Sequence, residues 1–516
     1  MAVQPFYITT PIYYVNDAPH LGHAYTTILA DVLARYHRLQ EQPTFFLTGT
    51  DEHGQKVQEA ARQHGEAPQA YVDRLAAQWQ ATWDDLHIAY DDFIRTTESR
   101  HVRVVQEMLQ RLWEEGQIYR DEYEGWYCVP DERFWTEKDA GDGVCPECGR
   151  PLQHLAETNY FFRMSNYQDW LLDYIDRHPQ FIRPESRRNE VLGFLQQPLG
   201  DLCISRPASR LDWGIPLPFD REFVTYVWFD ALLNYVTAAG YESAPERFQR
   251  LWPRTLHLIG KDILTTHAVY WPTMLQAMGL SQPRAIFAHG WWVLEGNIKI
   301  SKSRGNAVSP LELADYYGVD AFRYFLMRDM SLGRDASFSE EAIAQRYQGD
   351  LANDLGNLVH RLTHMITRYC DGRLPVPGPA TAAETALQAH CEALPGVIFP
   401  LVEEFALNNA LARIMGAVGE INRYLEQTAP WQQAKEGDEK RVATILYTAA
   451  EALRFCSLFL WPVLPVQTGQ IWRRLGWSVP ASLAEGLAWG GLQPHSTVHK
   501  GAPLFPRKER AQPGAG

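Results

Sequence analysis

Two short motifs combine residue types that can bind and stabilise a triphosphate. The first is His20-Leu21-Gly22-His23, in which two imidazoles three residues apart flank a glycine. Gly22 lets the backbone approach a ligand closely, and a helix that begins here presents free N–H groups and a partial positive charge to phosphate. A pair of exposed helix-capping histidines would give the same four letters, so this motif alone is a weak signal.

The second motif is Lys299-Ile300-Ser301-Lys302-Ser303, followed by Arg304-Gly305-Asn306. Two lysines three residues apart on a glycine-flanked loop can neutralise the charge that develops on departing pyrophosphate. Cations in that place stabilise the transition state more than bound ATP. A solvated basic turn is the commoner origin of a Lys- and Ser-rich loop, but the two motifs together are more specific than either alone.

The sequence around these motifs predicts the elements that position them. An amphipathic helix begins at His20, because apolar residues recur at three- and four-residue steps from there. The predicted strands cover Phe6–Thr9, Phe45–Leu47, His257–Gly260 and Ile286–His289. A turn over 49–54 ends the second strand. Strands that alternate with helices predict a parallel α/β sheet.

A third motif, Gly260-Lys261-Asp262 with His267 five residues later, directly follows a predicted strand. With the two phosphate motifs in this order, the chain resembles the class I aminoacyl-tRNA synthetases. The resemblance implies a doubly wound, Rossmann-like catalytic domain that uses ATP with Mg²⁺, and it implies that Asp262 holds the ATP ribose. It gives His20, His23, Lys299 and Lys302 as catalytic residues, and His20, Gly22, His23, Gly260, Asp262, Lys299, Ser301 and Lys302 as ATP-binding residues.

The flanking sequences resemble the methionyl-tRNA synthetase family along essentially the whole chain. The matching segments are Ile12-Tyr13-Tyr14-Val15-Asn16, Gly49-Thr50-Asp51-Glu52-His53-Gly54, Trp213-Gly214-Ile215-Pro216 and Tyr226-Val227-Trp228-Phe229-Asp230-Ala231. The resemblance implies that L-methionine is joined through methionyl-adenylate to the 3′-terminal ribose of initiator and elongator methionine tRNA. It implies that Asp51 pairs with the α-ammonium group. The implied methionine-binding residues are Ile12, Tyr14, Asp51, Trp228, Ala231, Leu232, Tyr235, Ile263 and His267.

The residue types of this set suit a thioether. Sulfur is soft and polarizable and prefers aromatic faces and edges. Tyr14 or His267 can offer it a weak hydrogen bond, which would distinguish sulfur from a methylene group. Ordinary core packing is the alternative origin of these aromatic residues, and without the flanking motifs it would be the favoured one.

A cysteine cluster suggests a structural zinc site. Cys128 and Asp131 form one pair at metal-ligand spacing, and Cys145 and Cys148 form the other within a Gly-Val-Cys-Pro-Glu-Cys-Gly turn. Asp131 stands where the four-cysteine pattern has a cysteine, but aspartate also ligates zinc. A metal-free loop with residual thiols is the alternative. If zinc binds, the closed ligand set predicts a structural role for one Zn²⁺.

Further along, the sequence becomes helical and poor in strands from about Ser339. Asn357 and Arg361, four residues apart, share one helix face, and Trp431 follows later. The resemblance implies that these three residues read the anticodon, since Asn and Arg hydrogen-bond base edges and Trp stacks on a base. A solvated surface is the usual origin of an Asn/Arg helix face alone.

Pattern and resemblance together divide the chain into five parts. Residues 1–115 and 229–335 are the two halves of the catalytic domain, and 116–228 are a connective insertion with the zinc-knuckle-like loop. Residues 336–505 form an α-helical anticodon-binding bundle, and 506–516 a disordered tail. An isoleucine, valine or leucine enzyme would carry a larger editing domain, and a non-catalytic RNA-binding relative would be expected to lose the phosphate-binding residues.

Composition sets limits on partners and compartment. With a net charge of −14 over 516 residues, the protein is not an indiscriminate polyanion binder, although local basic patches can still bind RNA. The N-terminus lacks a signal-peptide pattern, and no stretch reaches ~18 apolar residues. Seven thinly spread cysteines are typical of a reduced compartment. We therefore expect a cytoplasmic protein with no membrane partner. We also expect a monomer, because the chain ends before the dimerising domain that some bacterial family members carry.

Overall fold

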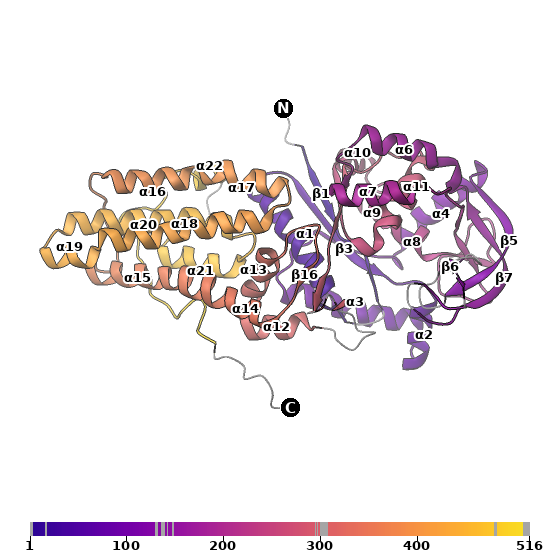
Figure 1. The fold of residues 1–516 in the computed structure, drawn as a ribbon, viewed down its shortest axis with the longest axis horizontal. Helices are drawn as coiled ribbons and strands as arrows, with labels where there is room; N and C mark the ends of the chain where they lie inside the picture. The colour runs from indigo at the N-terminus through magenta and orange to yellow at the C-terminus, as the bar shows by residue number, and fades with distance from the viewer. Residues whose placement is uncertain are drawn as a thin grey trace.

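The protein is elongated, with an α/β half and an all-helical half lying end to end in the computed structural model (Figure 1). The structure describes residues 4–15, 18–128, 133–135, 140–141, 143–146, 149–294, 296, 298–299, 308–478 and 482–508. Within this part of the chain, one hydrophobic cluster runs from the first strand into the last long helices. The two halves therefore share a core rather than a thin linker.

A seven-stranded sheet forms the centre of the α/β half. Its strands are β1 (Phe6–Thr9), β2 (Tyr13–Tyr14), β3 (Thr44–Asp51), β4 (Asp92–Arg95), β8 (Ile182–Arg183), β12 (Thr255–Gly260) and β13 (Ala285–His289). Each strand pairing in this sheet is parallel. From β1 the chain builds outward through β3 to β4, and later returns to the other side of β1 with β12 and β13. This reversal next to β1 is the topological switch point of a doubly wound sheet.

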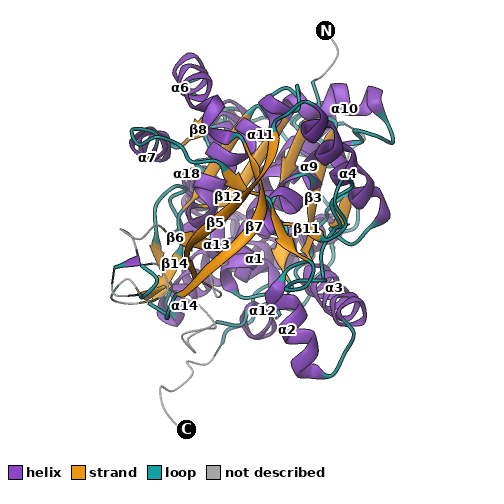
Figure 2. Ribbon diagram, turned by 90° about the vertical axis from the view of Figure 1, so that its right-hand side faces the viewer, coloured by secondary structure: helices purple, strands orange, loops and turns teal. Residues whose placement is uncertain are grey.

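Helices cover both faces of the sheet (Figure 2). On β1, Phe6 and Ile8 pack in the same cluster as α1, whereas Tyr7 packs in the cluster that contains α4 and α11. The alternation follows from the two-residue period of a strand. The helices of this half are α1 (Leu21–Leu39), α2 (Gln55–His64), α3 (Pro68–Asp85), α4 (Ser99–Glu114), α8 (Val227–Leu232), α9 (Asn234–Ala239), α10 (Pro245–Leu251) and α11 (Trp271–Ala277).

The strands predicted from the sequence are confirmed, with one change. The second strand does not end before 49–54, because β3 continues through Asp51. Gly49 permits this continuation: a Cβ atom there would lie 2.0 Å from the carbonyl oxygen of Ile94 on the neighbouring strand. The close approach of two strands therefore requires glycine at this position.

The segment 116–228 contains a second, antiparallel sheet in the order β6-β5-β7-β9. Its strands are β5 (Ile118–Cys128), β6 (Arg133–Trp135), β7 (Gln153–Phe162) and β9 (Leu202–Cys203), and a hairpin of β10 (Ser205–Pro207) and β11 (Phe223–Thr225) follows. The helices α6 (Gln168–Arg177) and α7 (Glu185–Phe194) flank β8. Because β8 pairs with β13 in the large sheet, this segment is not wholly separate from the parallel sheet.

After β13 the chain forms a small sheet of β14 (Trp292–Leu294), β15 (Ile298–Lys299) and β16 (Ala336–Ser337). The helices α12 (Pro310–Tyr317), α13 (Val319–Asp329) and α14 (Glu340–Arg346) connect it to the bundle. The bundle consists of α15 (Asn357–Tyr369), α16 (Ala382–Glu392), α17 (Leu394–Glu403), α18 (Leu407–Thr428), α19 (Pro430–Glu436), α20 (Glu439–Leu460), α21 (Pro465–Leu475) and α22 (Leu483–Gly486).

Helix α20 is the central helix of the bundle. It contacts α15, α16, α18, α19 and α21. Among the described helices it is the one that is long and apolar enough to cross a membrane, but 94% of its apolar window is buried inside the protein. Bundle packing therefore accounts for its hydrophobicity.

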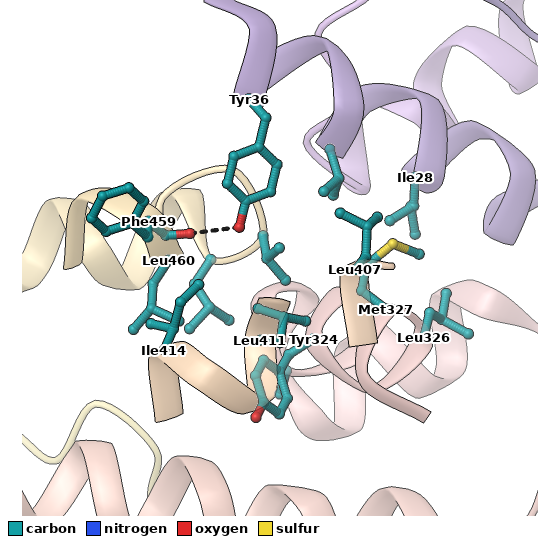
Figure 3. Close-up of a cluster of buried hydrophobic side chains, with 14 of the residues drawn as sticks. Ile28, Tyr36, Tyr324, Leu326, Met327, Leu407, Leu411, Ile414, Phe459 and Leu460 are labelled. Carbon is teal, nitrogen blue, oxygen red and sulfur yellow. Dashed lines mark hydrogen bonds between the residues drawn. The ribbon is translucent and has the colours of Figure 1, made fainter. Parts of the chain in front are cut away.

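The junction of the two halves is a packed apolar contact (Figure 3). Ile28 of α1 lies near Met327 of α13 and Leu407 of α18. The Tyr36 hydroxyl donates a 2.8 Å hydrogen bond to the carbonyl of Phe459. Buried Arg323 adds a polar link, since it donates to Asp31 of α1 and to the carbonyls of Pro462 and Val463. The helix that begins with the first phosphate motif is thus fixed to the bundle.

Candidate active site

A cavity of about 600 Å³ lies at the carboxyl ends of the parallel strands. Ligands of doubly wound sheets bind at this edge, next to the switch point. Fourteen predicted site residues line it: Ile12, Tyr14, His20, Gly22, His23, Asp51, Trp228, Ala231, Leu232, Tyr235, Gly260, Asp262, Ile263 and His267. Among them are all nine residues expected for methionine.

His20 and His23 stand at the start of α1, where the chain turns from the strand edge into the helix. His20 is the N-cap residue, and its Nδ1 accepts a 3.0 Å hydrogen bond from the Gly22 N–H. The Nδ1 of His23 accepts from the His20 N–H at 3.3 Å, which completes a capping box. The two rings stack with their centroids 3.7 Å apart. The first motif therefore caps the helix as well as lining the cavity.

Asp262 lies at the opposite wall, directly after β12. A Cβ atom on Gly260 would lie 2.5 Å from Asp262 Oδ1, so glycine is needed for this carboxylate to sit where it does. The Trp291 indole N–H donates to the same oxygen at 3.1 Å. Trp291 is itself fixed, because its backbone N–H donates to Asp335 and the Lys261 ammonium lies 4.0 Å from its ring centroid.

Tyr235 and His267 form a buried part of the cavity wall. The Nδ1 of His267 donates to the carbonyl of Ile263 at 3.0 Å, and the Tyr235 hydroxyl donates to Nε2 at 2.8 Å. Burial lowers the pKa of His267 to about 4, so this histidine is neutral at neutral pH. Both of its ring nitrogens are engaged within the protein, and this part of the cavity carries no charge from it.

Asp51 approaches the cavity from the end of β3 and is 4% exposed. Gly54, three residues later, has φ +112, and a Cβ atom there would lie 2.4 Å from the Tyr14 hydroxyl oxygen. A left-handed backbone and a close approach both require glycine here. The Lys56 ammonium lies 5.6 Å from the Tyr14 ring centroid, and Lys56 also lines the cavity.

Several cavity residues were not predicted from the sequence: Tyr13, Tyr25, Thr26, Lys56, Tyr226, His289, Gly290, Trp291 and Trp292. His289 accepts or donates a 2.8 Å hydrogen bond with Thr26 of α1 through Nε2. One signal could have found the His289–Trp292 group, because these residues follow a predicted strand at the carboxyl edge. The sequence gives no such signal for Thr26, because it is one polar residue within a predicted helix.

Some predicted residues lie outside the described residues, namely Asp131, Cys148, Ser301 and Lys302. Lys299 is described in its backbone, which pairs with Val293. Since Val293 follows the cavity-lining Trp292, the second phosphate motif begins beside the cavity. The predicted tail falls outside as well from residue 509 onward.

The described cysteines of the proposed metal site are buried together. Cys128 is 0% and Cys145 1% exposed, and both belong to one small cluster with Ala140 and Leu152. Cys145 opens a tight turn, in which the Gly149 N–H donates to its carbonyl at 2.9 Å. Among the described residues, no group of three metal-binding side chains is assembled. Cys128 ends β5 and Cys145 opens the turn, and the other two predicted ligands, Asp131 and Cys148, lie outside the described residues.

Two of the three predicted anticodon residues lie side by side on the bundle. Asn357 is exposed on α15, and the Arg361 guanidinium carbon lies 5.9 Å from the ring centroid of Trp431 on α19. Arg361 also lies 3.6 Å from a Glu426 oxygen. The structure thus brings Arg361 and Trp431 together across a long stretch of sequence, far from the cavity along the molecule (Figure 1).

The chain matches the family model described as tRNA synthetases class I (M) over residues 6–158 and 152–363. It is 47% identical to the methionine–tRNA ligase of Caldanaerobacter subterraneus subsp. tengcongensis over 504 residues, covering 97% of the chain and 78% of the relative. It is 44% identical to that of Streptomyces coelicolor, covering 98% of the chain and 97% of the relative.

Solved structures of the Mycobacterium tuberculosis methionyl-tRNA synthetase resemble this fold. In complex with methionyl-adenylate, that enzyme superposes with a TM-score of 0.92 at 42% identity, covering 98% of this chain and all of that one. Its apo form gives a TM-score of 0.87 at 39% identity, covering 99% of each chain.

Proposed function

The chain belongs to the methionyl-tRNA synthetases of class I, and we propose that the cavity of about 600 Å³ binds methionine and ATP side by side. The protein is a methionine–tRNA ligase. The carboxylate of methionine attacks the α-phosphate of ATP, the bond to the β-phosphate breaks, and methionyl-adenylate and pyrophosphate form. A hydroxyl group of the terminal tRNA ribose then attacks the carbonyl carbon, and AMP leaves.

The observation that carries the proposal is the mixture of residue types on the cavity wall, which we divide into two ends. One end has the buried Asp51 carboxylate and a neutral aromatic wall of Trp228, Tyr235 and His267. This end fits an α-ammonium group and an uncharged thioether side chain. Of the two donors to sulfur that the sequence offers, we favour Tyr14, because both nitrogens of His267 are engaged. Ile12, Ala231, Leu232 and Ile263 complete this end.

The other end fits ATP. His20, Gly22 and His23 stand at the N-terminus of α1, where N–H groups and imidazoles attract phosphate. Asp262, held by Trp291, would accept hydrogen bonds from the ribose hydroxyls. Lys299, Ser301 and Lys302 would bind the leaving pyrophosphate, with Mg²⁺ brought by ATP. Most of the rate enhancement would come from positioning and electrostatics.

Zinc would be held by Cys128, Asp131, Cys145 and Cys148 in the antiparallel part of the molecule. The burial of Cys128 and Cys145 in one small cluster supports this. The role is structural, because the ligand set is closed and the β5–β7 sheet lies at the end of the molecule away from the bundle (Figure 1). The five-part division of the chain, the cytoplasmic location and the monomeric state belong to the same proposal.

For methionine tRNA, we propose that the anticodon is read by Asn357, Arg361 and Trp431. The cation–aromatic pair of Arg361 and Trp431 offers a stacking platform beside an exposed amide, the arrangement that reads unpaired bases.

The assignment of the cavity is tested by replacing Asp51. Asp51→Ala should raise the KM for methionine in ATP–pyrophosphate exchange by about 100-fold, the scale of a lost charge-assisted contact, and leave the KM for ATP within about twofold. Asp73→Asn, at a nearby exposed carboxylate on α3, is the control and should change neither. A wild-type methionine KM in Asp51→Ala would remove the assignment.

A further inference from the structure

A fully buried carboxylate lies between two histidines behind the methionine end of the cavity. Asp230 Oδ2 accepts a 2.6 Å hydrogen bond from His53 Nδ1, and Oδ1 accepts a 2.7 Å bond from His101 Nε2. Asp230 and His101 are 0% exposed and His53 is 6% exposed. His101 Nδ1 lies 3.3 Å from the Thr237 hydroxyl. None of these four residues lines the cavity.

The three bonded residues come from three different parts of the fold. His53 lies two residues after Asp51, on the turn that leaves β3. Asp230 is on α8, between Trp228 and Ala231, which both line the cavity. His101 is on α4, and its partner Thr237 is on α9 together with Tyr235. One carboxylate therefore ties together the backbones that present Asp51, Trp228 and Tyr235.

The charge of Asp230 makes this connection a strong one. Burial raises its pKa, but His53 and His101 outweigh that effect and leave the pKa at about 2. The carboxylate is therefore ionised, so it only accepts, and each ring donates an N–H to a different oxygen. Bonds to a charged buried acceptor are shorter and stronger than neutral ones, and removing one donor leaves the charge poorly compensated.

We propose that His53, Asp230 and His101 are positioning residues for methionine, which set the distance between the ammonium-binding Asp51 and the side-chain wall on α8 and α9. This inference rests on the proposed assignment of the methionine end. The rest of the same turn is already anchored elsewhere: Glu52 pairs with Arg95 at 2.7 Å, and the Trp213 indole donates to the Glu52 carbonyl. Only the His53 bond runs from this turn to α8 among the described contacts.

Two pairs of variants separate the effect of hydrogen bonding from the effect of side-chain volume. In His53→Asn, the amide nitrogen takes the place of Nδ1, whereas His53→Leu offers no donor. In His101→Gln, the amide nitrogen takes the place of Nε2, whereas His101→Leu offers none. The alternative to positioning is a purely structural bridge, which would lower thermal stability and affect both substrates alike.

The experiment measures KM for methionine, KM for ATP and kcat in pyrophosphate exchange on the full chain, with thermal unfolding beside it. His53→Leu and His101→Leu should raise the methionine KM about tenfold, the scale for one lost bond to a charged group, with the ATP KM within about twofold. His53→Asn and His101→Gln should recover most of the loss. Glu384→Gln is the matched control: this carboxylate in the bundle is 3% exposed and accepts from Arg441 and Tyr424, so it should lower stability without moving either KM.

The proposal is overturned if the leucine variants leave the methionine KM unchanged, or if both KM values rise together. It is also overturned if Asn and Gln do no better than Leu. Asp51→Ala distinguishes a failure of the positioning role from a failure of the cavity assignment. If that variant loses methionine while His53→Leu does not, the positioning role fails and the cavity assignment stands. If Asp51→Ala itself keeps methionine binding, the cavity assignment fails.

Discussion

The cavity and the bundle face formed by Asn357, Arg361 and Trp431 use their aromatic and polar residues in opposite ways. In the cavity, Tyr235 and His267 are 1% and 2% exposed, and their polar atoms bond to one another and to the backbone. On the bundle, Asn357 is exposed, and Arg361 and Trp431 are half-buried beside each other. In the cavity these two polar side chains are buried and bonded within the protein, whereas on the bundle the amide of Asn357 faces solvent.

The difference agrees with the size of the ligand that we propose for each site. A single amino acid can be surrounded, so selectivity can come from a rigid, neutral wall that is fixed before binding. An RNA loop cannot be enclosed, so its bases must be read by groups that reach outward and stack. The junction at Arg323 and Tyr36 joins the two sites rigidly, but amino-acid activation needs only the first.

The largest expected effect comes from His20→Asn, which tests the phosphate end. Asparagine is a good N-cap residue, so helix α1 should keep its cap while the imidazole is lost. We expect kcat for exchange to fall by about 10²–10³-fold, the scale for removing one stabilising donor, with little change in thermal stability. Wild-type exchange in this variant would show that His20 serves only as a cap.

A second test uses the buried, neutral state of His267. Its pKa is about 4 in the folded protein, against about 6.5 in the unfolded chain. Between these values the unfolded chain binds the additional proton, so this contribution to stability is full above pH ~6.5 and is lost as pH falls toward ~4. The loss amounts to about 3 kcal/mol.

His267→Gln should therefore flatten the decline in unfolding free energy between pH 6.5 and 4, measured by urea denaturation. Other groups still titrate in both proteins, so the informative quantity is the difference between the two slopes. Equal slopes would mean that the pKa of His267 is not lowered in the folded protein, and that this part of the cavity wall is charged in that pH range.

On the bundle, Asn357→Ala, Arg361→Ala and Trp431→Ala should each weaken charging of methionine tRNA by about 1–3 kcal/mol per base contact. Exchange without tRNA should remain almost unchanged, because the cavity does not depend on these side chains. The anticodon assignment is tested by the ratio of charging efficiencies for cognate tRNA and a tRNA with an altered anticodon. If that ratio is the same in wild type and in all three variants, the anticodon assignment is wrong.

The smallest effect concerns the bond between Tyr235 and His267. Tyr235→Phe removes the donor to Nε2 and leaves a buried acceptor without its partner, at a cost of about 1 kcal/mol. We expect the methionine KM to rise roughly fivefold by the same measure, while the ATP KM stays constant. A rise in the ATP KM instead would place Tyr235 in the nucleotide end of the cavity.

Local sequence was sufficient to predict the position of site residues that directly follow a strand. Gly260, Asp262 and His267 follow β12, and their position at the carboxyl edge follows from a predicted strand in a parallel sheet. The expected halves of the fold appear for the same reason: alternation of strands and helices before Ser339, and apolar helices after it. The methionine residues came from resemblance, since nothing in their spacing distinguishes them from core aromatics.

The rest depended on contacts between distant segments. In the sequence, His53 is one histidine in a turn and Asp230 is one aspartate in a helix. Their hydrogen bond could not be predicted, because no periodicity relates residues that are 177 positions apart. Strand β8 is two residues long and lies within an irregular segment, so its pairing with β13 was not predictable from alternation. The hydrogen bond from the Trp291 N–H to Asp335 was not predictable, because Asp335 lies beyond the second phosphate motif in the sequence.

The central claim is that the cavity, with its buried Asp51 carboxylate and its uncharged aromatic wall, selects methionine before any tRNA is bound. An amino-acid panel in ATP–pyrophosphate exchange, without tRNA, tests this most directly. The account predicts that methionine supports exchange with a kcat/KM at least about 100-fold above that of leucine, isoleucine or valine, the upper range that one apolar pocket supplies. Comparable exchange with any of these three, or no exchange with methionine until tRNA is added, would contradict it.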